Sequence, residues 1–230
     1  MNSFPFNIKK LSKEEGIILA DYEKMADAVI KGNQDQVVEL TEQAVDEGIE
    51  PNEIIGKGLI NGMNVVGKRF KAGDMFVPEV LMSAKAMKAG MNIVKPLLLE
   101  GEMPSEGKVL LGTVSGDLHD IGKNLVGMMM ESGGFEIINL GTDIEPEEFA
   151  AKVKEHKPDV LGMSALLTTT MLSMRDTIEV LEEEGLRDSV KIMVGGAPVT
   201  KEFADEIGAD GWAPDAASAK DLAIELINKQ

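Results

Sequence analysis

The sequence predicts an α/β protein in two parts: an antiparallel four-helix bundle, then a five-stranded parallel sheet covered by helices on both faces. In the first hundred residues, apolar side chains recur at steps of three and four, which is the spacing of one helix face. From residue 108 onward, short apolar β-rich runs alternate with helical stretches, an order typical of parallel sheets. We therefore expect a helical domain over 1–100, a linker over 101–107 and a sheet domain over 108–230.

The first part contains four helical patterns separated by glycine or by short polar turns. Gly32 and Gly48 end the first two patterns, and Pro51 and Pro78 open the last two, since proline suits the first turn of a helix. Short connections between four helices favour an antiparallel bundle. The helices are expected over residues 19–30, 37–45, 51–70 and 78–97.

Glycines are unusually frequent in the third of these helices. Gly56, Gly58, Gly62 and Gly67 all lie inside it, although each glycine costs a helix roughly 0.8–1 kcal/mol relative to alanine. Either neighbouring helices approach closely at these positions, or the helix leaves room for something large and flat. The sequence leaves both explanations open.

The second part reads as five strands and five helices. The strands are expected over 108–116, 136–141, 159–167, 191–196 and 211–214, and the helices over 120–132, 146–156, 170–185, 201–207 and 215–228. Ligands of such sheets bind beyond the carboxyl ends of the strands, where the strand order reverses. The loops to search are therefore 114–122, 164–170 and 195–199.

Composition excludes several classes of function. The net charge is −17, which opposes binding to nucleic acid or to anionic membrane surfaces. Cysteine is absent, so disulfides, iron–sulfur ligation, thiolate zinc sites and a cysteine nucleophile are excluded. No apolar run reaches the ~18 residues of a membrane span, and the first residues lack the apolar region of a secretory signal. A cytoplasmic location is expected.

The first loop carries an imidazole beside carboxylates. Its sequence, from Gly116 to Asn124, lacks the glycines of a phosphate-binding loop. His119 follows Asp117 by two residues, so one ring N–H can be donated to that carboxylate, leaving the other nitrogen as a metal ligand or base. Alternatively, His119 only caps the following helix. The second histidine, His156, falls on a polar helix face.

The other two loops are rich in hydroxyls and in glycine. Ser164, Thr168 and Thr170 follow the third strand, where they would either cap the next helix or bind a ligand. Gly195 and Gly196 follow the fourth strand and would form a tight turn or let a ligand approach bare backbone.

Together, these motifs resemble a known family. The order Asp117-x-His119-x-x-Gly122, Ser164-x-Leu166, Gly195-Gly196 resembles the cobalamin-binding domain, which has a Rossmann-like (flavodoxin-like) sheet. The segment DLHDIGKN is similar to that of methionine synthase, and residues 62–87 are similar to the helical cap of methyl-transferring corrinoid proteins. The resemblance covers about residues 15–228.

This resemblance implies a cobalamin or related corrinoid as cofactor, with His119 as the lower axial ligand of cobalt. Asp117 would accept the other ring N–H of His119, and Thr170 stands where methionine synthase has a serine. The residues implied in holding the cofactor are Asp117, Leu118, His119, Asp120, Ile121, Gly122, Ser164, Leu166, Thr168, Thr170, Gly195, Gly196 and Ala197, with Phe70 and Val77 covering the upper face of the corrin. The family often has glycine between Ser164 and Leu166, where this chain has Ala165, so the slot for the nucleotide tail would be narrower.

The function implied is that of a methyl carrier, not catalytic alone, with the cofactor bound base-off and His-on. Its partners would be a substrate:corrinoid methyltransferase, a corrinoid:folate or corrinoid:thiol methyltransferase, and a reductive activator. The linker would serve as a hinge. A cobalamin storage or delivery protein and a metal-free flavodoxin-like signalling or binding domain are the alternatives. The methyl donor, the acceptor, the lower base of the corrinoid and the oligomeric state stay open.

Overall fold

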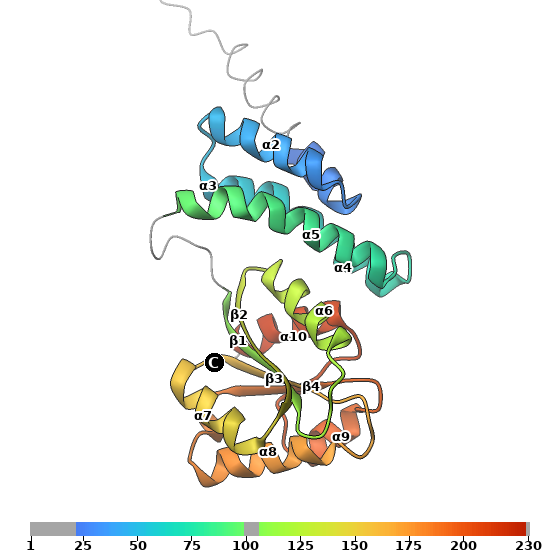
Figure 1. Ribbon diagram of the computed structural model, residues 1–230, viewed down its shortest axis with the longest axis vertical. Coiled ribbons are helices and arrows are strands. Elements are labelled where there is room, and N and C mark those ends of the chain that lie inside the picture. The colour runs from blue at the N-terminus through green and yellow to red at the C-terminus, as the bar shows by residue number, and fades with distance from the viewer. Residues whose placement is uncertain (1–21, 99–105, 229–230) are drawn as a thin grey trace, which may run out of the picture. The chain divides into compact units, whose positions relative to one another are not determined.

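The computed structural model describes residues 22–98 and 106–228. These form two compact units, residues 22–66 with 78–98 and residues 67–77 with 106–228. Figure 1 shows both units along the chain. Most of the expected linker and hinge, residues 101–105, lies outside the described residues. No helix in the described ranges is long and apolar enough to cross a membrane.

The first part of the chain is helical, as its apolar spacing predicts. Residues 22–30 are helical at the start of the described chain. The remaining elements are α2 (Gln34–Asp46), a continuous helical run of α3 (Pro51–Glu53), η1 (Ile54–Ile60) and α4 (Asn61–Ala72), and then α5 (Val77–Val94) with η2 (Lys95–Leu97). The segment η1 is a π-helix, a local widening that the sequence did not predict.

Close packing explains one of the helical glycines most clearly. A Cβ at Gly62 would lie 2.8 Å from the backbone oxygen of Ala26 and 2.8 Å from Cβ of Val29, so the first helix approaches too closely for any side chain there. A Cβ at Gly58 would lie 2.4 Å from Sδ of Met25. A Cβ at Gly56, in contrast, would meet nothing within 4 Å. Helix contact therefore accounts for Gly58 and Gly62 but not for Gly56.

The second part is the expected α/β fold. Its five strands are all parallel and lie in the order β2-β1-β3-β4-β5. The strands are β1 (Gly107–Val114), β2 (Phe135–Ile144), β3 (Val160–Ser164), β4 (Lys191–Gly195) and β5 (Gly211–Trp212). The helices are α6 (Ile121–Glu131), α7 (Pro146–His156), α8 (Leu172–Glu183), α9 (Lys201–Glu206) and α10 (Ala216–Asn228), with a short η3 (Arg187–Ser189) before β4. The predicted fold class is confirmed.

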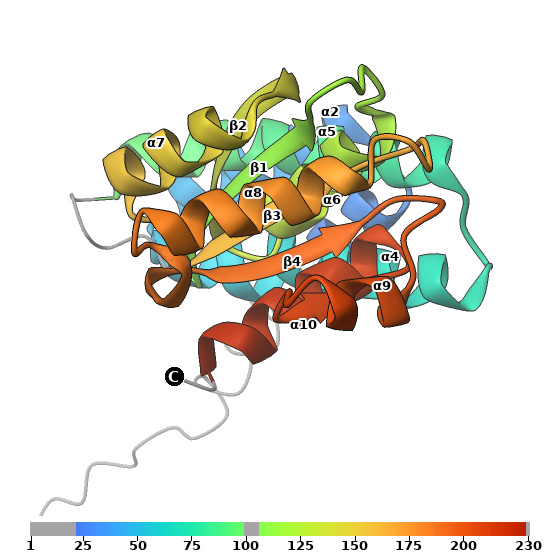
Figure 2. The ribbon, with the colours of Figure 1, turned by 90° about the horizontal axis from the view of Figure 1, so that it is seen from below.

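Each face of the sheet has its own core because neighbouring strand residues point to opposite faces. Leu110 packs with Phe149 of α7 and Met174 of α8. Leu111, one residue along, packs with Met130 of α6 on the opposite face, which α10 also covers. Figure 1 shows α6 and α10 on one side of the strands and α7 and α8 on the other, and Figure 2 shows the sheet from the α7 and α8 side.

The strand order places a crevice at the carboxyl end of β1. The chain crosses from β1 outward to β2 and then back past β1 to β3. The loops that follow β1 and β3 therefore leave the sheet edge in different directions. In open α/β sheets, ligands bind at this switch point.

Candidate functional site

The loop after β1 turns Asp117 inward. The strand ends at Val114, and the backbone N–H of Asp117 donates to the carbonyl oxygen of Val114 at 3.1 Å. This turn points the carboxylate away from water, and Asp117 is fully buried. A buried carboxylate must be met by hydrogen-bond donors, since the desolvation penalty is otherwise large.

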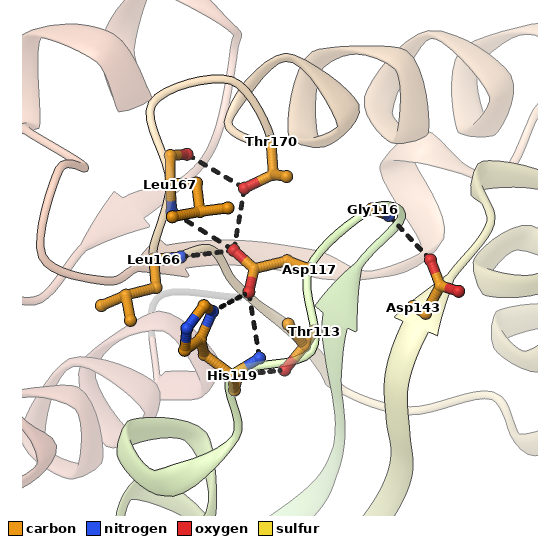
Figure 3. Close-up of polar contacts among 8 residues, drawn as sticks. All are labelled: Thr113, Gly116, Asp117, His119, Asp143, Leu166, Leu167 and Thr170. Atoms are coloured by element: carbon orange, nitrogen blue, oxygen red, sulfur yellow. Dashed lines mark hydrogen bonds and ion pairs between the residues drawn. The ribbon is translucent and has the colours of Figure 1, made fainter.

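Five donors from two loops surround the Asp117 carboxylate (Figure 3). Its Oδ1 lies 2.7 Å from Nδ1 of His119 and accepts from the backbone N–H of the same residue at 3.0 Å. Its Oδ2 accepts from the backbone N–H groups of Leu166 at 2.7 Å and Leu167 at 3.3 Å. The hydroxyl of Thr170 lies 2.8 Å from the same oxygen. One carboxylate therefore joins the loops that follow β1 and β3.

These donors decide the charge of Asp117. Burial alone raises its pKa, but the backbone N–H groups of His119 and Leu166, the His119 ring and the Thr170 hydroxyl together lower it further than burial raises it. The net pKa lies well below the ordinary value for aspartate, so the group is an anion at neutral pH.

The anionic carboxylate fixes the orientation of His119. Because Asp117 can only accept, Nδ1 of His119 carries the proton between them. In the neutral ring, the other nitrogen, Nε2, keeps its lone pair. The His119 side chain is 53% exposed, so Nε2 is available to an incoming group. This is the arrangement by which proteins prepare a histidine as a metal ligand.

Thr170 lies where the sequence comparison with methionine synthase predicted a hydroxyl. It is buried, and its Oγ1 is within 2.9 Å of the carbonyl oxygen of Leu167 as well as close to Asp117. A hydroxyl has one proton, so it can donate to only one of these two acceptors at a time.

A cavity of about 580 Å³ lies beside His119. Such a volume is within the ~300–1,000 Å³ range of small-molecule sites. Its walls run from the loops down between the sheet and the helices α6 and α10. Lining residues from the sheet domain include Leu111, Leu118, His119, Leu125, Gly162, Met163, Ser164, Met193, Ala213, Ala216 and Ala219. The cavity is mostly apolar, with an imidazole at its rim.

Most of the predicted site residues gather at this cavity. Those that line it are Phe70, Leu118, His119, Asp120, Ile121, Gly122, Ser164, Leu166, Gly195, Gly196 and Ala197. Asp117 and Thr170 do not line the cavity: Asp117 contacts the Nδ1 side of the imidazole, and Thr170 contacts Asp117. Thr168 is exposed in its loop and is not among the lining residues. Phe70 belongs to α4 and Val77 begins α5, both half-buried, and their cover of a bound corrin stays a prediction.

Gly196, the residue after β4, has a structural explanation within the protein itself. Gly196 has φ +128, and a Cβ there would lie 1.8 Å from the carbonyl oxygen of Ala165. The loops after β3 and β4 are thus pressed together, and the N–H of Ala165 donates to the carbonyl of Gly195 at 3.2 Å. Gly196 is required by this backbone contact, whatever else the loop binds.

Lys123 is a site residue that the sequence reasoning missed. It is buried on α6, and its Nζ donates to Oδ1 of Asn139 at 2.7 Å and to the carbonyl of Gly141. Burial lowers the pKa of Lys123, and the charge of Asp120 partly counters that effect. The sequence offered only its place as the last but one residue of DLHDIGKN, and the partners on β2 are distant in the chain.

The geometry fits a metal that brings its own ligands. A metal held by one imidazole must obtain its other ligands elsewhere, and within the described ranges no group of three or more His, Asp or Glu side chains gathers as a metal site. A Cβ at Gly122 would meet nothing within 4 Å, so the rim beside His119 is open. A macrocyclic cofactor with a side arm matches such a rim and cavity.

Comparison with known proteins agrees with this geometry. Two family profiles, each described as a B12 binding domain, match residues 107–220 and residues 22–95. A dimethylamine corrinoid protein from Methanosarcina barkeri is 48% identical over 218 residues, which cover 94% of this chain and 100% of the relative. A corrinoid protein from Desulfitobacterium hafniense is 47% identical over 216 residues, 93% of this chain and 100% of the relative.

A solved structure shares the fold over nearly the whole chain. The methanol:cobalamin methyltransferase complex MtaBC from Methanosarcina barkeri contains a chain that is 30% identical, with a TM-score of 0.81. The match covers 99% of this chain and 95% of that chain. With both B12 binding domains present in order, this chain belongs to the family of cobalamin-binding corrinoid proteins of methyltransferase systems.

Proposed function

We propose that this chain is a methyl carrier that holds its corrinoid base-off, with Nε2 of His119 as the lower axial ligand of cobalt. The observation that carries the proposal is the fixed imidazole: Nδ1 is held 2.7 Å from Asp117, while the other side of the ring opens toward a deep apolar cavity. When bound, the corrinoid supplies the cobalt that accepts and releases the methyl group.

The chain's own residues would then bind the corrinoid, orient the imidazole and tune its basicity toward the metal. Asp117 holds the proton on Nδ1 and so raises the basicity of Nε2 toward the metal. The apolar walls of Gly162, Met163 and Met193 would accommodate the displaced nucleotide tail, with Ser164 as a polar partner at the top. An apolar cover from Phe70 and Val77 would exclude water from the reacting face.

The carrier role requires partner enzymes. One methyltransferase would load the methyl group from a substrate and a second would pass it to a folate or a thiol, while a reductive activator would restore oxidised cobalt. The relatives named as dimethylamine or trimethylamine corrinoid proteins are 43–48% identical. Among the solved structures, a monomethylamine corrinoid protein from Methanosarcina barkeri is 40% identical, against 30% for the methanol complex. This difference favours a methylated amine as the methyl donor.

The axial role of His119 is tested by the visible spectrum of the corrinoid-loaded protein. We expect His119→Ala to bind the corrinoid without an imidazole ligand and to shift the spectrum accordingly. His156→Ala is the matched control, because His156 is the only other histidine and ends α7, outside the cavity lining. Identical spectra for wild type and His119→Ala would overturn the assignment.

A second experiment separates carriage from storage. The loaded, reduced protein is incubated with a methylamine methyltransferase and its substrate, and methylation of the cofactor is followed by absorbance. A methyl carrier becomes methylated only with both present. A storage or delivery protein remains unmethylated with every donor but still hands its corrinoid to an acceptor protein.

A further inference from the structure

The carboxyl end of β2 is irregular. It pairs with β1 in regular register as far as Leu111 opposite Asn139, and then one extra β2 residue is inserted before Gly141 and another before Ile144. Such bulges bend a strand and redirect its side chains, and they are common beside active sites. Here they turn the end of β2 toward the loop that carries Asp117.

Asp143 lies in the second bulge in a left-handed conformation, with φ +58. Within the described residues, Lys157 at φ +48 is the only other non-glycine residue with positive φ. Lys157 is the C-cap of α7, where this conformation is common. Asp143 caps no helix, and a left-handed residue costs roughly 1–2 kcal/mol. Something in the native fold must offset that cost.

Two hydrogen bonds join Asp143 to the loop after β1, and Figure 3 shows the one that its side chain accepts. Its Oδ1 accepts from the backbone N–H of Gly116 at 2.7 Å. Its own backbone N–H donates to the carbonyl oxygen of Asp117 at 3.1 Å. These two hydrogen bonds hold the backbone on both sides of the peptide bond between Gly116 and Asp117. The left-handed turn is what allows the side chain and the backbone N–H of one residue to face the same loop.

The first bulge, around Asn139 and Gly141, is also bonded to the chain segment that follows β1. Lys123 donates to Asn139 and to the carbonyl of Gly141, as described above, and the N–H of Gly141 donates to Oδ1 of Asn139 at 3.1 Å. Both bulges of β2 thus bond to the segment 116–123 that carries His119. Neither set of bonds involves the imidazole itself.

We propose that Asp143 is a positioning residue for His119: it fixes the Gly116–Asp117 backbone so that the Asp117 carboxylate reaches the imidazole. This inference rests on the proposed function for its consequence at cobalt, but the positioning itself is a property of the protein without cofactor. Partners that orient a metal-bound histidine change metal affinity about 10–100-fold when mutated. Asp143 acts on His119 through Asp117, one residue further away, so its replacement should change the affinity of His119 for the metal by about tenfold, the lower end of that range.

The test uses three variants of the full-length protein. Asp143→Asn keeps an acceptor at the same place and tolerates positive φ. Asp143→Gly relieves the backbone strain but removes the acceptor. Lys157→Gly relieves the same kind of strain far from the loop and serves as the matched control. If Asp143 had only a structural role, its replacement would lower the free energy of unfolding and leave the His119 ring unchanged. In Asp143→Gly, the relief of backbone strain should partly offset that loss of stability.

The first readout is made without cofactor, by nitrogen NMR of the His119 ring. We expect wild type, Asp143→Asn and Lys157→Gly to show the proton held on Nδ1, and Asp143→Gly to show a mixture of tautomers. The second readout is the fraction of bound corrinoid with a histidine ligand, from the visible and electron paramagnetic resonance spectra. The equilibrium constant for histidine ligation should fall about tenfold in Asp143→Gly and stay unchanged in the other two variants.

The outcomes separate the two claims. If Asp143→Gly keeps the wild-type tautomer and histidine ligation, the positioning role is wrong even where His119→Ala proves the axial ligand. If His119→Ala leaves the spectrum unchanged, the axial ligand is wrong, and the tautomer measurement still decides on Asp143. Should Asp143→Gly not fold, hydrogen exchange at the Gly116 amide of wild type replaces it: exchange at the rate of an unbonded exposed amide overturns the proposal.

Discussion

At the scale of the residue, the site depends on how one buried anion is satisfied. Asp117 receives donors from its own loop and from Leu166, Leu167 and Thr170 of the loop after β3. Removing any one donor leaves the buried carboxylate with fewer hydrogen bonds. The resulting loss of stability is larger than the net contribution of an ordinary hydrogen bond, because the charge stays buried. The same bonds that lower the pKa of Asp117 also orient His119, so stability and ligand preparation have one physical origin.

Thr170 gives the residue-scale prediction. Thr170→Val keeps the shape but loses the hydroxyl 2.8 Å from the carboxylate. We expect a loss of about 2 kcal/mol in the free energy of unfolding, as for other hydrogen bonds to charged groups. Thr170→Ser keeps the hydroxyl and should lose less than about 1 kcal/mol. Denaturant unfolding of the cofactor-free protein measures both. Equal midpoints for the two variants would show that the hydroxyl contributes nothing.

At the scale of the element, the helical unit is held by polar contacts as well as by glycine packing. The hydroxyl of Tyr22, in the first helix, donates to Oε2 of Glu53 in α3 at 3.1 Å. Burial, followed by that hydrogen bond and the charge of Glu53, raises the pKa of Tyr22 to about 12. The neutral phenol is therefore favoured in the folded unit relative to the unfolded chain.

The sign of this shift gives a pH prediction. The stabilisation from Tyr22 is fully present below the ordinary pKa of 10.0 and is lost as pH rises toward about 12. Wild type should therefore lose stability over this interval, and Tyr22→Phe should lose less. Because Tyr22 is the only tyrosine, phenolate absorbance reports its ionisation directly. Ionisation at the ordinary pKa in the folded protein would contradict the expectation.

At the scale of the whole molecule, the chain divides into two compact units and carries two B12 binding domain matches. One match covers 22–95 and the other 107–220. The net charge of −17 opposes association with other acidic surfaces.

Cofactor binding gives the whole-molecule prediction. A ligand that binds only the folded protein stabilises it by about 2.7 kcal/mol at a free concentration of 100 times Kd, and by about 1.4 kcal/mol for each further tenfold increase. We expect the thermal midpoint of the cofactor-free protein to rise continuously with added cobalamin. Removing the corrinoid should reverse the gain. A midpoint independent of cobalamin concentration would contradict specific binding to the folded state.

The sequence by itself determined the fold class and the edge of the sheet at which the candidate site lies. Apolar periodicity set helices and strands, and most boundaries fall within a few residues of those observed. The strand expected over 136–141 extends to residues 135–144, because its end is bulged and polar and so lacks the apolar pattern. Asp117 and His119 were found as a carboxylate and an imidazole two residues apart in a loop after a strand, and Thr170 was found through the resemblance to methionine synthase.

Only the tertiary structure decided what those residues touch. Periodicity reports which face a side chain occupies, not which distant backbone groups meet it. The contact of Gly196 with Ala165, the clamp of Asp143 on Gly116 and the burial of Lys123 against β2 all join segments far apart in sequence. Such contacts arise when the strands are ordered in the sheet, so a pattern local to the chain cannot contain them.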